Sequence, residues 1–412
     1  MLSRRAFLRT SLQASSLLAL APTVPAFLAR TVQAAQPERD GRILVVIQLD
    51  GGNDGINTVV PFGDEGYAKY RKVLRLPTNR LFKINKEVGL HPEMGEAAQL
   101  LESGRLGIVQ GVSYPNPSRS HFRSMTIWQS AKVDLPRPEN DIGLTEDKAL
   151  YGWIGRALDE GPGPADGSPG TVFVGDATPP LAVRSRRSTT STMTRPEDSV
   201  LTLPGETRLD SPLSENGTDL TAFVRRSTLD AYITSARMSD VLRVEDKGAK
   251  YPATGLAGRL RVIARLIKGG VGTRVFYTSQ GGYDTHTVQL SIHDFLLAEL
   301  SGALKAFLDD LAAAKLADRV LVLCFSEFGR RVQENGSRGT DHGTAAPIFL
   351  AGPKVNAGLL GEAPKVLDLQ DGDLKMTTDF RRVYASVLRD WLGLPSRSAL
   401  GGDFEPLPLF RS

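Results

Sequence analysis

The stretch that decides the fold is Ile43-Leu44-Val45-Val46-Ile47-Gln48-Leu49-Asp50-Gly51-Gly52-Asn53-Asp54. It begins with five apolar residues and ends in a glycine turn, a pattern that predicts a strand buried on both faces, as in a parallel sheet. Asp50 stands where that strand would end. Ligand sites in open α/β sheets form beyond the carboxyl ends of strands, so Asp50 is a candidate metal ligand or catalytic acid. The alternative is that an aspartate in a glycine loop only caps a turn.

Strand and helix patterns alternate along the rest of the chain. Further strands are expected at 106–112, 273–278, 319–325 and 347–350, and helices at 121–131, 290–314 and 379–392. In the helix at 121–131, we expect Phe122, Met125 and Trp128 along one face. The alternation predicts an α/β fold with a mostly parallel sheet flanked by helices. Residues of about 177–218 are rich in Ser, Thr, Pro and Arg, and are expected to form a surface insertion.

Length and charge limit the classes of function. The chain has 412 residues, which fits one large α/β domain with insertions or two domains. Its formal net charge of +4 equals the four arginines of residues 1–35, a segment without acids. The remaining body is neutral, which gives no electrostatic reason to expect nucleic-acid binding. The single cysteine, Cys324, cannot form an internal disulfide and is expected to be a small buried hydrophobe.

The N-terminus has the features of an export signal. Ser3-Arg4-Arg5-Ala6-Phe7-Leu8-Arg9 precedes an apolar stretch that is broken by Pro22 and Pro25. This pattern resembles a twin-arginine signal peptide; the alternatives are an ordinary secretory signal or a short membrane anchor. We therefore expect a signal peptide at 1–35, export by the twin-arginine translocase, and a periplasmic or secreted single domain at 36–412. The apolar run is too short and proline-broken for a permanent membrane span.

Acids and histidines gather at the predicted strand ends. They are Asp50 after the first strand, Asp284 and His286 after 273–278, Glu327 after 319–325, and Asp341 and His342 before 347–350. The carboxyl ends of parallel strands share one edge, and a loop running back would bring Asp341 and His342 there too. Such a set predicts a site for a divalent metal: Zn²⁺, Mn²⁺, Fe²⁺, Mg²⁺ or Ca²⁺. The alternative for Glu327 is an ion pair with Arg330 or Arg331.

The loop before the helix at 121–131 is the other candidate catalytic region. Ser118 or Ser120 would lie at the helix N-terminus, where backbone N–H groups favour an anion. A serine there, next to a metal, could attack phosphorus or sulfur, and Ser120 is the candidate nucleophile. The alternative is that Ser118 serves only as the N-cap. His121 has no structural duty in the first helical turn and is a second candidate catalytic residue.

Several of these motifs occur in the same order in one known family. They are Leu49-Asp50-Gly51-Gly52-Asn53-Asp54-Gly55, Ser118-Arg119-Ser120-His121-Phe122, Tyr283-Asp284-Thr285-His286, Ser326-Glu327-Phe328-Gly329-Arg330 and Asp341-His342-Gly343. With the twin-arginine start, the chain resembles the exported bacterial family called domain of unknown function 1501. That family is grouped with the alkaline phosphatase and sulfatase superfamily. The resemblance implies an alkaline phosphatase-like fold and a metal-dependent phospho- or sulfo-hydrolase.

The resemblance also implies roles for single residues. Asp50 matches the superfamily's first-strand aspartate ligand, and Asp284 and His286 match its Asp…His pair, with a shorter spacing. Glu327 takes the place of the usual aspartate, and Phe328 stands where a histidine would be. His342 matches the last histidine ligand. The residue two before Pro117 is Pro115, which argues against a formylglycine sulfatase.

Two functions remain in view. The first is an exported metal-dependent hydrolase that acts on phosphate or sulfate esters of small molecules or glycans. The second is a non-catalytic binding or assembly protein on a degenerate hydrolase fold, favoured by the missing histidine and the unclear nucleophile. Fold analogy alone does not choose between them.

Overall fold

The computed structural model describes residues 41–135, 150–164, 166–194, 236, 238–244, 246 and 249–411. The predicted signal peptide at 1–35 lies outside these residues, and so does the part of the predicted insertion from 195 to 218. Within the described residues, no helix is long and apolar enough to cross a membrane.

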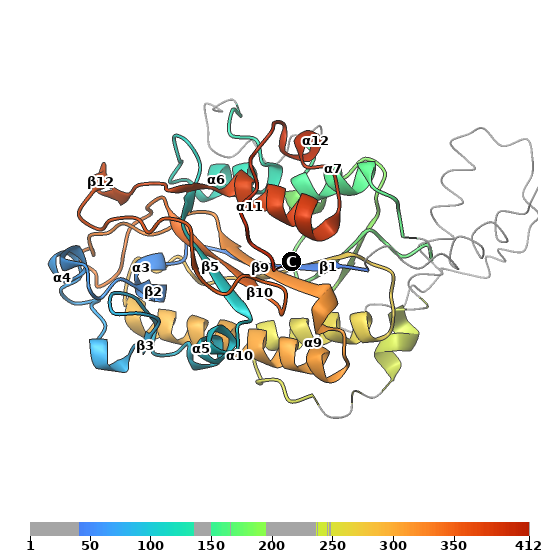
Figure 1. Ribbon diagram of the computed structural model, residues 1–412, viewed down its shortest axis with the longest axis horizontal. Helices are drawn as coiled ribbons and strands as arrows, with labels where there is room; N and C mark the ends of the chain where they lie inside the picture. Colours follow the sequence, from blue (N-terminus) through green and yellow to red (C-terminus); the bar gives the residue numbers. More distant parts are fainter. Residues whose placement is uncertain are drawn as a thin grey trace, which may run out of the picture. The chain divides into compact units, whose positions relative to one another are not determined.

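A nine-stranded sheet forms the centre of the part of the chain that the structure describes (Figure 1). Its strands, in spatial order, are β11 (Gly358–Leu360), β5 (Leu106–Ser113), β10 (Ala346–Ala351), β9 (Val320–Ser326), β1 (Ile43–Leu49), β8 (Val275–Gln280), β6 (Thr171–Val174) and β7 (Thr190–Met193), and β14 (Thr378–Asp379) pairs with β5. β1 is central and pairs in parallel with both β8 and β9. Among the described strands of this sheet, only the pairings of β10 are antiparallel, so the prediction of a mostly parallel sheet is confirmed.

The direction of β10 determines where the loop before it lies. β10 runs antiparallel to β9, with Leu350 opposite Leu323. The start of β10 therefore lies at the same edge as the carboxyl ends of β1, β8 and β9. The sequence predicted a loop that runs back across the sheet to bring Asp341 and His342 to this edge. That loop is not needed, because the antiparallel strand β10 itself begins there.

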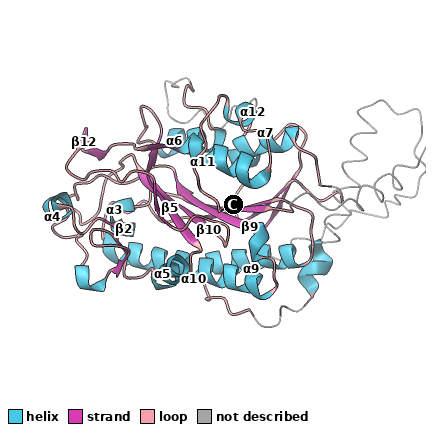
Figure 2. Ribbon diagram, viewed as in Figure 1, coloured by secondary structure: helices cyan, strands magenta, loops and turns pink. Residues whose placement is uncertain are grey.

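Helices cover both faces of the sheet (Figure 2). One layer consists of α5 (Gly95–Glu102), α9 (Gly255–Lys268) and α10 (Gln289–Ala313). The other consists of α6 (His121–Ser130), α7 (Trp153–Glu160), α11 (Phe380–Ser386), its π-helical continuation η6 (Val387–Leu392) and α12 (Arg397–Leu400). In β1, Val45 and Ile47 pack in the first core and Leu44 and Val46 in the second, as expected for a strand buried on both faces.

Shorter elements complete the fold of the described residues. They are α3 (Gly55–Thr58), α4 (Glu65–Tyr70), the small sheet of β2 (Val59–Val60), β4 (Gly89–Leu90) and β3 (Phe82–Lys83), the hairpin of β12 (Leu369–Gln370) and β13 (Asp373–Leu374), and the 3₁₀ turns η1 (Thr78–Arg80), η3 (Leu181–Val183) and η5 (Ala317–Arg319). The three residues expected along one face of α6 differ in burial: Trp128 is in the core, whereas Phe122 is 60% exposed.

Candidate metal centre

The loops that follow β1, β8 and β9 begin at the same level of the sheet. Leu49, the last residue of β1, is paired with Gln280 of β8 and with Ser326 of β9. Asp50 and Glu327 therefore leave the sheet side by side, and the loop with Asp284 leaves next to them. The N-terminus of α6 and the loop before β10 complete the site.

Gly51 allows the loops after β1 and β8 to touch. Its φ of +118° lies in the region that favours glycine, and a Cβ atom there would be 2.4 Å from the backbone nitrogen of Asp284. The N–H of Gly51 donates a hydrogen bond of 2.9 Å to Oε1 of Glu327. Gly51 thus contacts the backbone of Asp284 and the side chain of Glu327, and it holds these two predicted site residues close together.

Three imidazoles surround one carboxylate oxygen. Oδ1 of Asp284 lies 3.0 Å from Nε2 of His286, 3.0 Å from Nε2 of His342 and 3.5 Å from Nε2 of His121. The Nε2 atoms of His286 and His342 are 2.9 Å apart. We call these four residues the histidine cluster. It brings together Asp284, His286 and His342, as expected from the sequence, and adds His121.

The opposite nitrogen of each ring lies against an oxygen acceptor. Nδ1 of His121 is 2.8 Å from Glu327 Oε1, and Nδ1 of His286 is 3.2 Å from Asp341 Oδ1. Nδ1 of His342 is 2.8 Å from the carbonyl oxygen of Arg119. A carboxylate or carbonyl oxygen can only accept, so each Nδ1 donates. In the neutral rings, the three Nε2 atoms then carry lone pairs that point toward Asp284.

This donor set fits a metal ion. Three ring nitrogens and a carboxylate oxygen face one another without a proton between them, an arrangement that a cation stabilises. Nε2 of His121 is buried and has no hydrogen-bond partner. Ligand atoms of His121, Asp284 and His342 all lie within 4.8 Å of one another. Imidazole-rich sets favour Zn²⁺, Fe²⁺ or Mn²⁺ over Mg²⁺ and Ca²⁺, which prefer oxygen ligands.

The electrostatics of the cluster keep Asp284 ionised. Burial alone would raise its pKa, but the hydrogen bond and the charge of Arg330, together with the contact to the ring of His342, lower it to about 2. Burial lowers the pKa of His342 below the usual value, which favours the neutral ring that a metal requires. The hydrogen bond to Glu327 raises the pKa of His121.

Arg330 ties the loops of the site together and was missed as a site residue. Its buried guanidinium donates to Asp284 Oδ1 at 2.6 Å, to the carbonyl of Thr340 at 2.8 Å and to that of Tyr283 at 2.9 Å. The sequence offered Arg330 only as a partner for Glu327. The structure pairs it with Asp284, while Glu327 contacts His121 and Gly51.

Asp50 lies beside the cluster. Gln48 Nε2 donates to Asp50 Oδ1 at 2.5 Å. Burial raises the pKa of Asp50 to about 6, with the Gln48 hydrogen bond opposing and the charge of Glu327 adding to the increase. Asp50 lines a cavity of about 560 Å³ together with His121, Asp284 and Glu327. Among the described residues, no hydrogen bond or ion pair joins the side chain of Asp50 to the four residues of the histidine cluster.

Ser120 is the N-cap of α6. Its Oγ accepts a hydrogen bond of 3.5 Å from the backbone N–H of Arg123, and its own N–H donates to Ser118 Oγ. The alternative that Ser118 caps this helix is therefore wrong. The contacts of Ser120 are those of a capping residue, and its role as a nucleophile stays a prediction.

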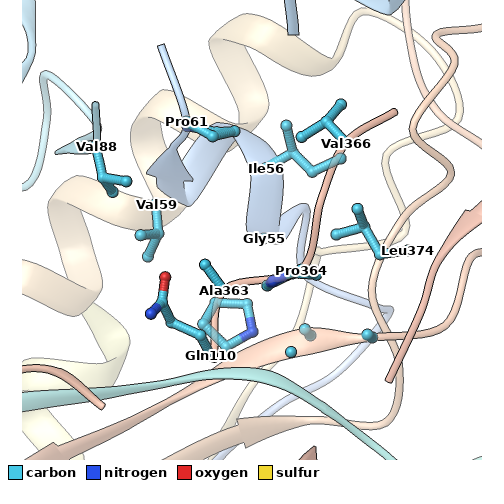
Figure 3. A pocket seen from close by; sticks show the side chains of 14 residues that line it. Gly55, Ile56, Val59, Pro61, Val88, Gln110, Ala363, Pro364, Val366 and Leu374 are labelled. Carbon is cyan, nitrogen blue, oxygen red and sulfur yellow. The ribbon is translucent and has the colours of Figure 1, made fainter. Parts of the chain in front are cut away.

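A second cavity, of about 60 Å³, does not belong to the site (Figure 3). Its lining side chains are apolar, among them Ile56, Val59, Val366 and Leu374, apart from the amide of Gln110. Among the described residues that line it, none is titratable, so it offers no groups for acid–base or metal chemistry.

Fold and cluster together define an α/β protein with a candidate metal centre at the carboxyl edge of its sheet. The family model described as "Protein of unknown function (DUF1501)" matches residues 42–399, and the chain belongs to that family. The family resemblance noted in the sequence is thereby confirmed. No curated protein matches the chain in sequence.

Three of the solved structures with some similarity to the chain come from different bacteria. The lipoteichoic acid synthase LtaP from Listeria monocytogenes is 10% identical, with 83% of this chain and 77% of that chain covered and a TM-score of 0.38. The C-terminal periplasmic domain of EcEptC from Escherichia coli is 12% identical, with 90% and 88% covered and a TM-score of 0.39. The PsFucS1 sulfatase from Pseudoalteromonas sp. is 9% identical, with 93% and 76% covered and a TM-score of 0.35. At these scores no activity follows for this chain.

Proposed function

We propose that this protein is a metal-dependent hydrolase of phosphate or sulfate esters. One observation carries the proposal: three Nε2 atoms, each with its Nδ1 held by an oxygen acceptor, surround Asp284 Oδ1. Metal-binding histidines are commonly oriented in this way by a carboxylate or carbonyl on the other nitrogen. A site built only for stability would not direct three lone pairs at a carboxylate.

The ligands in this proposal are His121, His286, His342 and Asp284. Glu327 and Asp341, expected as ligands from the sequence, instead orient His121 and His286. His121, expected as a catalytic residue, becomes a ligand in this proposal. It supplies a histidine in place of the one that is missing at Phe328. When bound, a divalent metal would polarise the ester oxygens and activate a water for attack.

Asp50 is the candidate proton acceptor. It lines the same cavity as His121 and Asp284, and the hydrogen bond from Gln48 fixes its orientation. A carboxylate in that place can take a proton from the attacking water. Asp50, expected as a metal ligand from the sequence, therefore acts as a base in this proposal. The Oγ of Ser120 is engaged in the N-cap hydrogen bond of α6, so we favour attack by water over attack by Ser120.

The sequence of residues 1–35 supports a location for this activity outside the cytoplasm. We propose export of the folded protein by the twin-arginine translocase and activity of a single domain at 36–412 in the periplasm or outside the cell. Because this route carries folded proteins, the metal can be acquired before export.

Metal loading followed by turnover tests the function. The mature protein is stripped with a chelator, reloaded with Zn²⁺, Mn²⁺ or Fe²⁺, and assayed on 4-nitrophenyl phosphate and 4-nitrophenyl sulfate. We expect close to one metal per chain and turnover of at least one ester, both lost in His342→Ala and kept in Asp368→Asn, an exposed control. A metal-loaded protein that hydrolyses neither ester would favour the non-catalytic binding protein instead.

A further inference from the structure

The cavity next to the histidine cluster has one polar and one apolar side. Its volume is about 560 Å³, within the range of small-molecule sites. The polar side consists of Asp50, His121, Asp284 and Glu327. What we call the apolar side is the set of apolar lining residues: Phe122 and Met125 from α6, Pro179 and Pro180 from the loop before η3, and Leu181 at the start of η3. Thr126, Gln129, Thr178 and Arg184 also line the cavity. A molecule in this cavity would contact both cluster residues and apolar side chains.

Phe122 is the most informative residue of the apolar side. It directly follows the cluster residue His121, yet its side chain is 60% exposed. An exposed phenylalanine leaves a flat apolar surface in water, and that surface is covered when a ring stacks on it. Its position in the cavity lining places this surface beside the candidate metal centre.

Buried amides fix the apolar side relative to Asp50. The N–H of Leu181 donates to Gln129 Oε1 at 2.9 Å, and Gln129 Nε2 donates to Gln48 Oε1 at 2.7 Å. Gln48 in turn donates to Asp50. Gln48 and Gln129 are each only 7% exposed. The width of the cavity is therefore set by a hydrogen-bonded chain, and a ligand would meet a preformed site.

Among the described lining residues, the side chains with a full charge are the carboxylates of Asp50, Asp284 and Glu327 and the guanidinium of Arg184. The three carboxylates belong to the polar side, where the ester group would lie. Phe122, Met125, Pro179, Pro180 and Leu181 carry no charge and no hydrogen-bonding side chain. The apolar side thus suits a group that is uncharged and flat.

From these observations we propose that the cavity binds the alcohol part of the substrate, and that this part is an uncharged ring stacked on Phe122. The inference rests on the proposed function, because it takes the ester group to lie at the histidine cluster. The substrate class is then a phosphate or sulfate monoester of a ring-bearing alcohol, in which the ring is aromatic or is a sugar ring with an apolar face.

The test measures binding without turnover. The affinities of the Zn²⁺-loaded mature protein for phenylphosphonate and methylphosphonate are compared by calorimetry, as are those for benzenesulfonate and methanesulfonate. In the pair whose anion binds, the phenyl compound should bind about three- to tenfold more tightly. Phe122→Ala should remove this preference and leave the methyl compound unchanged. Phe295→Ala removes a phenylalanine that is 64% exposed outside the cavity, and should change nothing.

The other outcomes are decisive as well. Equal affinities for the phenyl and methyl compounds, a preference that survives in Phe122→Ala, or binding of neither pair would overturn the inference. A turnover assay separates this inference from the proposed function. A protein that prefers the phenyl compound but hydrolyses no ester would support the ring-binding cavity and contradict the proposed hydrolase. Cyclohexylphosphonate, a ring without aromaticity, distinguishes the two sources, because a sugar-type site binds it as tightly as phenylphosphonate.

Discussion

Each histidine of the cluster has one ring nitrogen at an oxygen acceptor and the other near Asp284. The acceptors are Glu327, Asp341 and the carbonyl of Arg119. They decide which nitrogen carries the proton, and therefore which nitrogen can bind a metal. At the scale of single residues, the proposed metal binding therefore depends on these partners as much as on the ligands.

Glu327 tests this dependence. Its side chain is only 2% exposed and hydrogen-bonds to His121. Among the described residues, no hydrogen bond or ion pair joins it to Asp284. Glu327→Gln keeps the shape but loses the charge that supports the imidazole. We expect the affinity for Zn²⁺, measured by competition with a chelating dye, to fall by about ten- to a hundredfold. Glu87→Gln, on the surface, is the control. An unchanged affinity in Glu327→Gln would show that Glu327 has no role in metal binding.

The residue types of the site could be predicted from the sequence, but their roles could not. Asp284, His286 and His342 follow or precede predicted strands, so parallel-sheet logic brought them together. His121 lies between Glu327 and Asp284, with Nδ1 against Glu327 and Nε2 near Asp284. Which of the two residues, Glu327 or His121, reaches the cluster depends on this arrangement, and the order of residues along the chain does not reveal it. Arg330 was missed because its contacts are to backbone carbonyls of three separate loops.

At the scale of elements, the turn after β1 should be intolerant of side chains. Gly51→Ala would place Cβ 2.4 Å from the nitrogen of Asp284 at a strained positive φ. We expect the free energy of unfolding in urea to fall by about 2–4 kcal/mol. Gly281→Ala is a matched control in a neighbouring loop, since no atom lies within 4 Å of its Cβ position. Equal stability of the two variants would contradict this view of the turn.

The β12–β13 hairpin should influence the metal through Arg119. Asp373, at the start of β13, is buried and accepts hydrogen bonds from Arg119 Nε at 2.8 Å and from its terminal nitrogen at 2.5 Å. The carbonyl of the same arginine holds His342. We expect Asp373→Asn to weaken Zn²⁺ binding by up to about tenfold. Asp368→Asn, with an exposed ion pair to Lys375 near the same hairpin, should bind Zn²⁺ normally. A loss of stability without a loss of affinity would leave Asp373 a purely structural role.

Most elements near the site could be predicted, but the direction of one strand could not. Strands β1, β5, β8 and β9 were expected within about two residues, because their apolar runs are continuous and end in turn residues. The residues of β10 look like those of any buried strand, and its antiparallel direction depends on its neighbours. That direction is what brings His342 to the carboxyl edge.

At the scale of the whole molecule, a buried ion pair near the site should govern stability in acid. Burial alone would raise the pKa of Asp54, but the charge of Arg71 lowers it below the usual value. The pair therefore stabilises the fold above the unfolded-state pKa of about 4. This contribution is lost as the pH falls through the lower folded-state pKa.

Asp54→Asn measures that contribution. It leaves the guanidinium of Arg71, with 0% of its side chain exposed, without its charged partner, and should cost about 3–5 kcal/mol at neutral pH. Below pH 4 the free-energy difference between wild type and variant should shrink. Urea unfolding at a series of pH values checks both effects. A difference that stays constant down to pH 2 would exclude Asp54 as the titrating group.

The measurement that tests the central claim most directly is X-ray absorption at the zinc edge of the reloaded protein. We predict a single bound Zn²⁺ whose spectrum fits three imidazoles and at least one oxygen, and a fit with two imidazoles in each of His121→Ala, His286→Ala and His342→Ala. A folded protein without bound zinc would contradict the account. A wild-type spectrum with two or fewer imidazoles would contradict it too, because carboxylates such as Asp50 or Glu327 would then be the ligands.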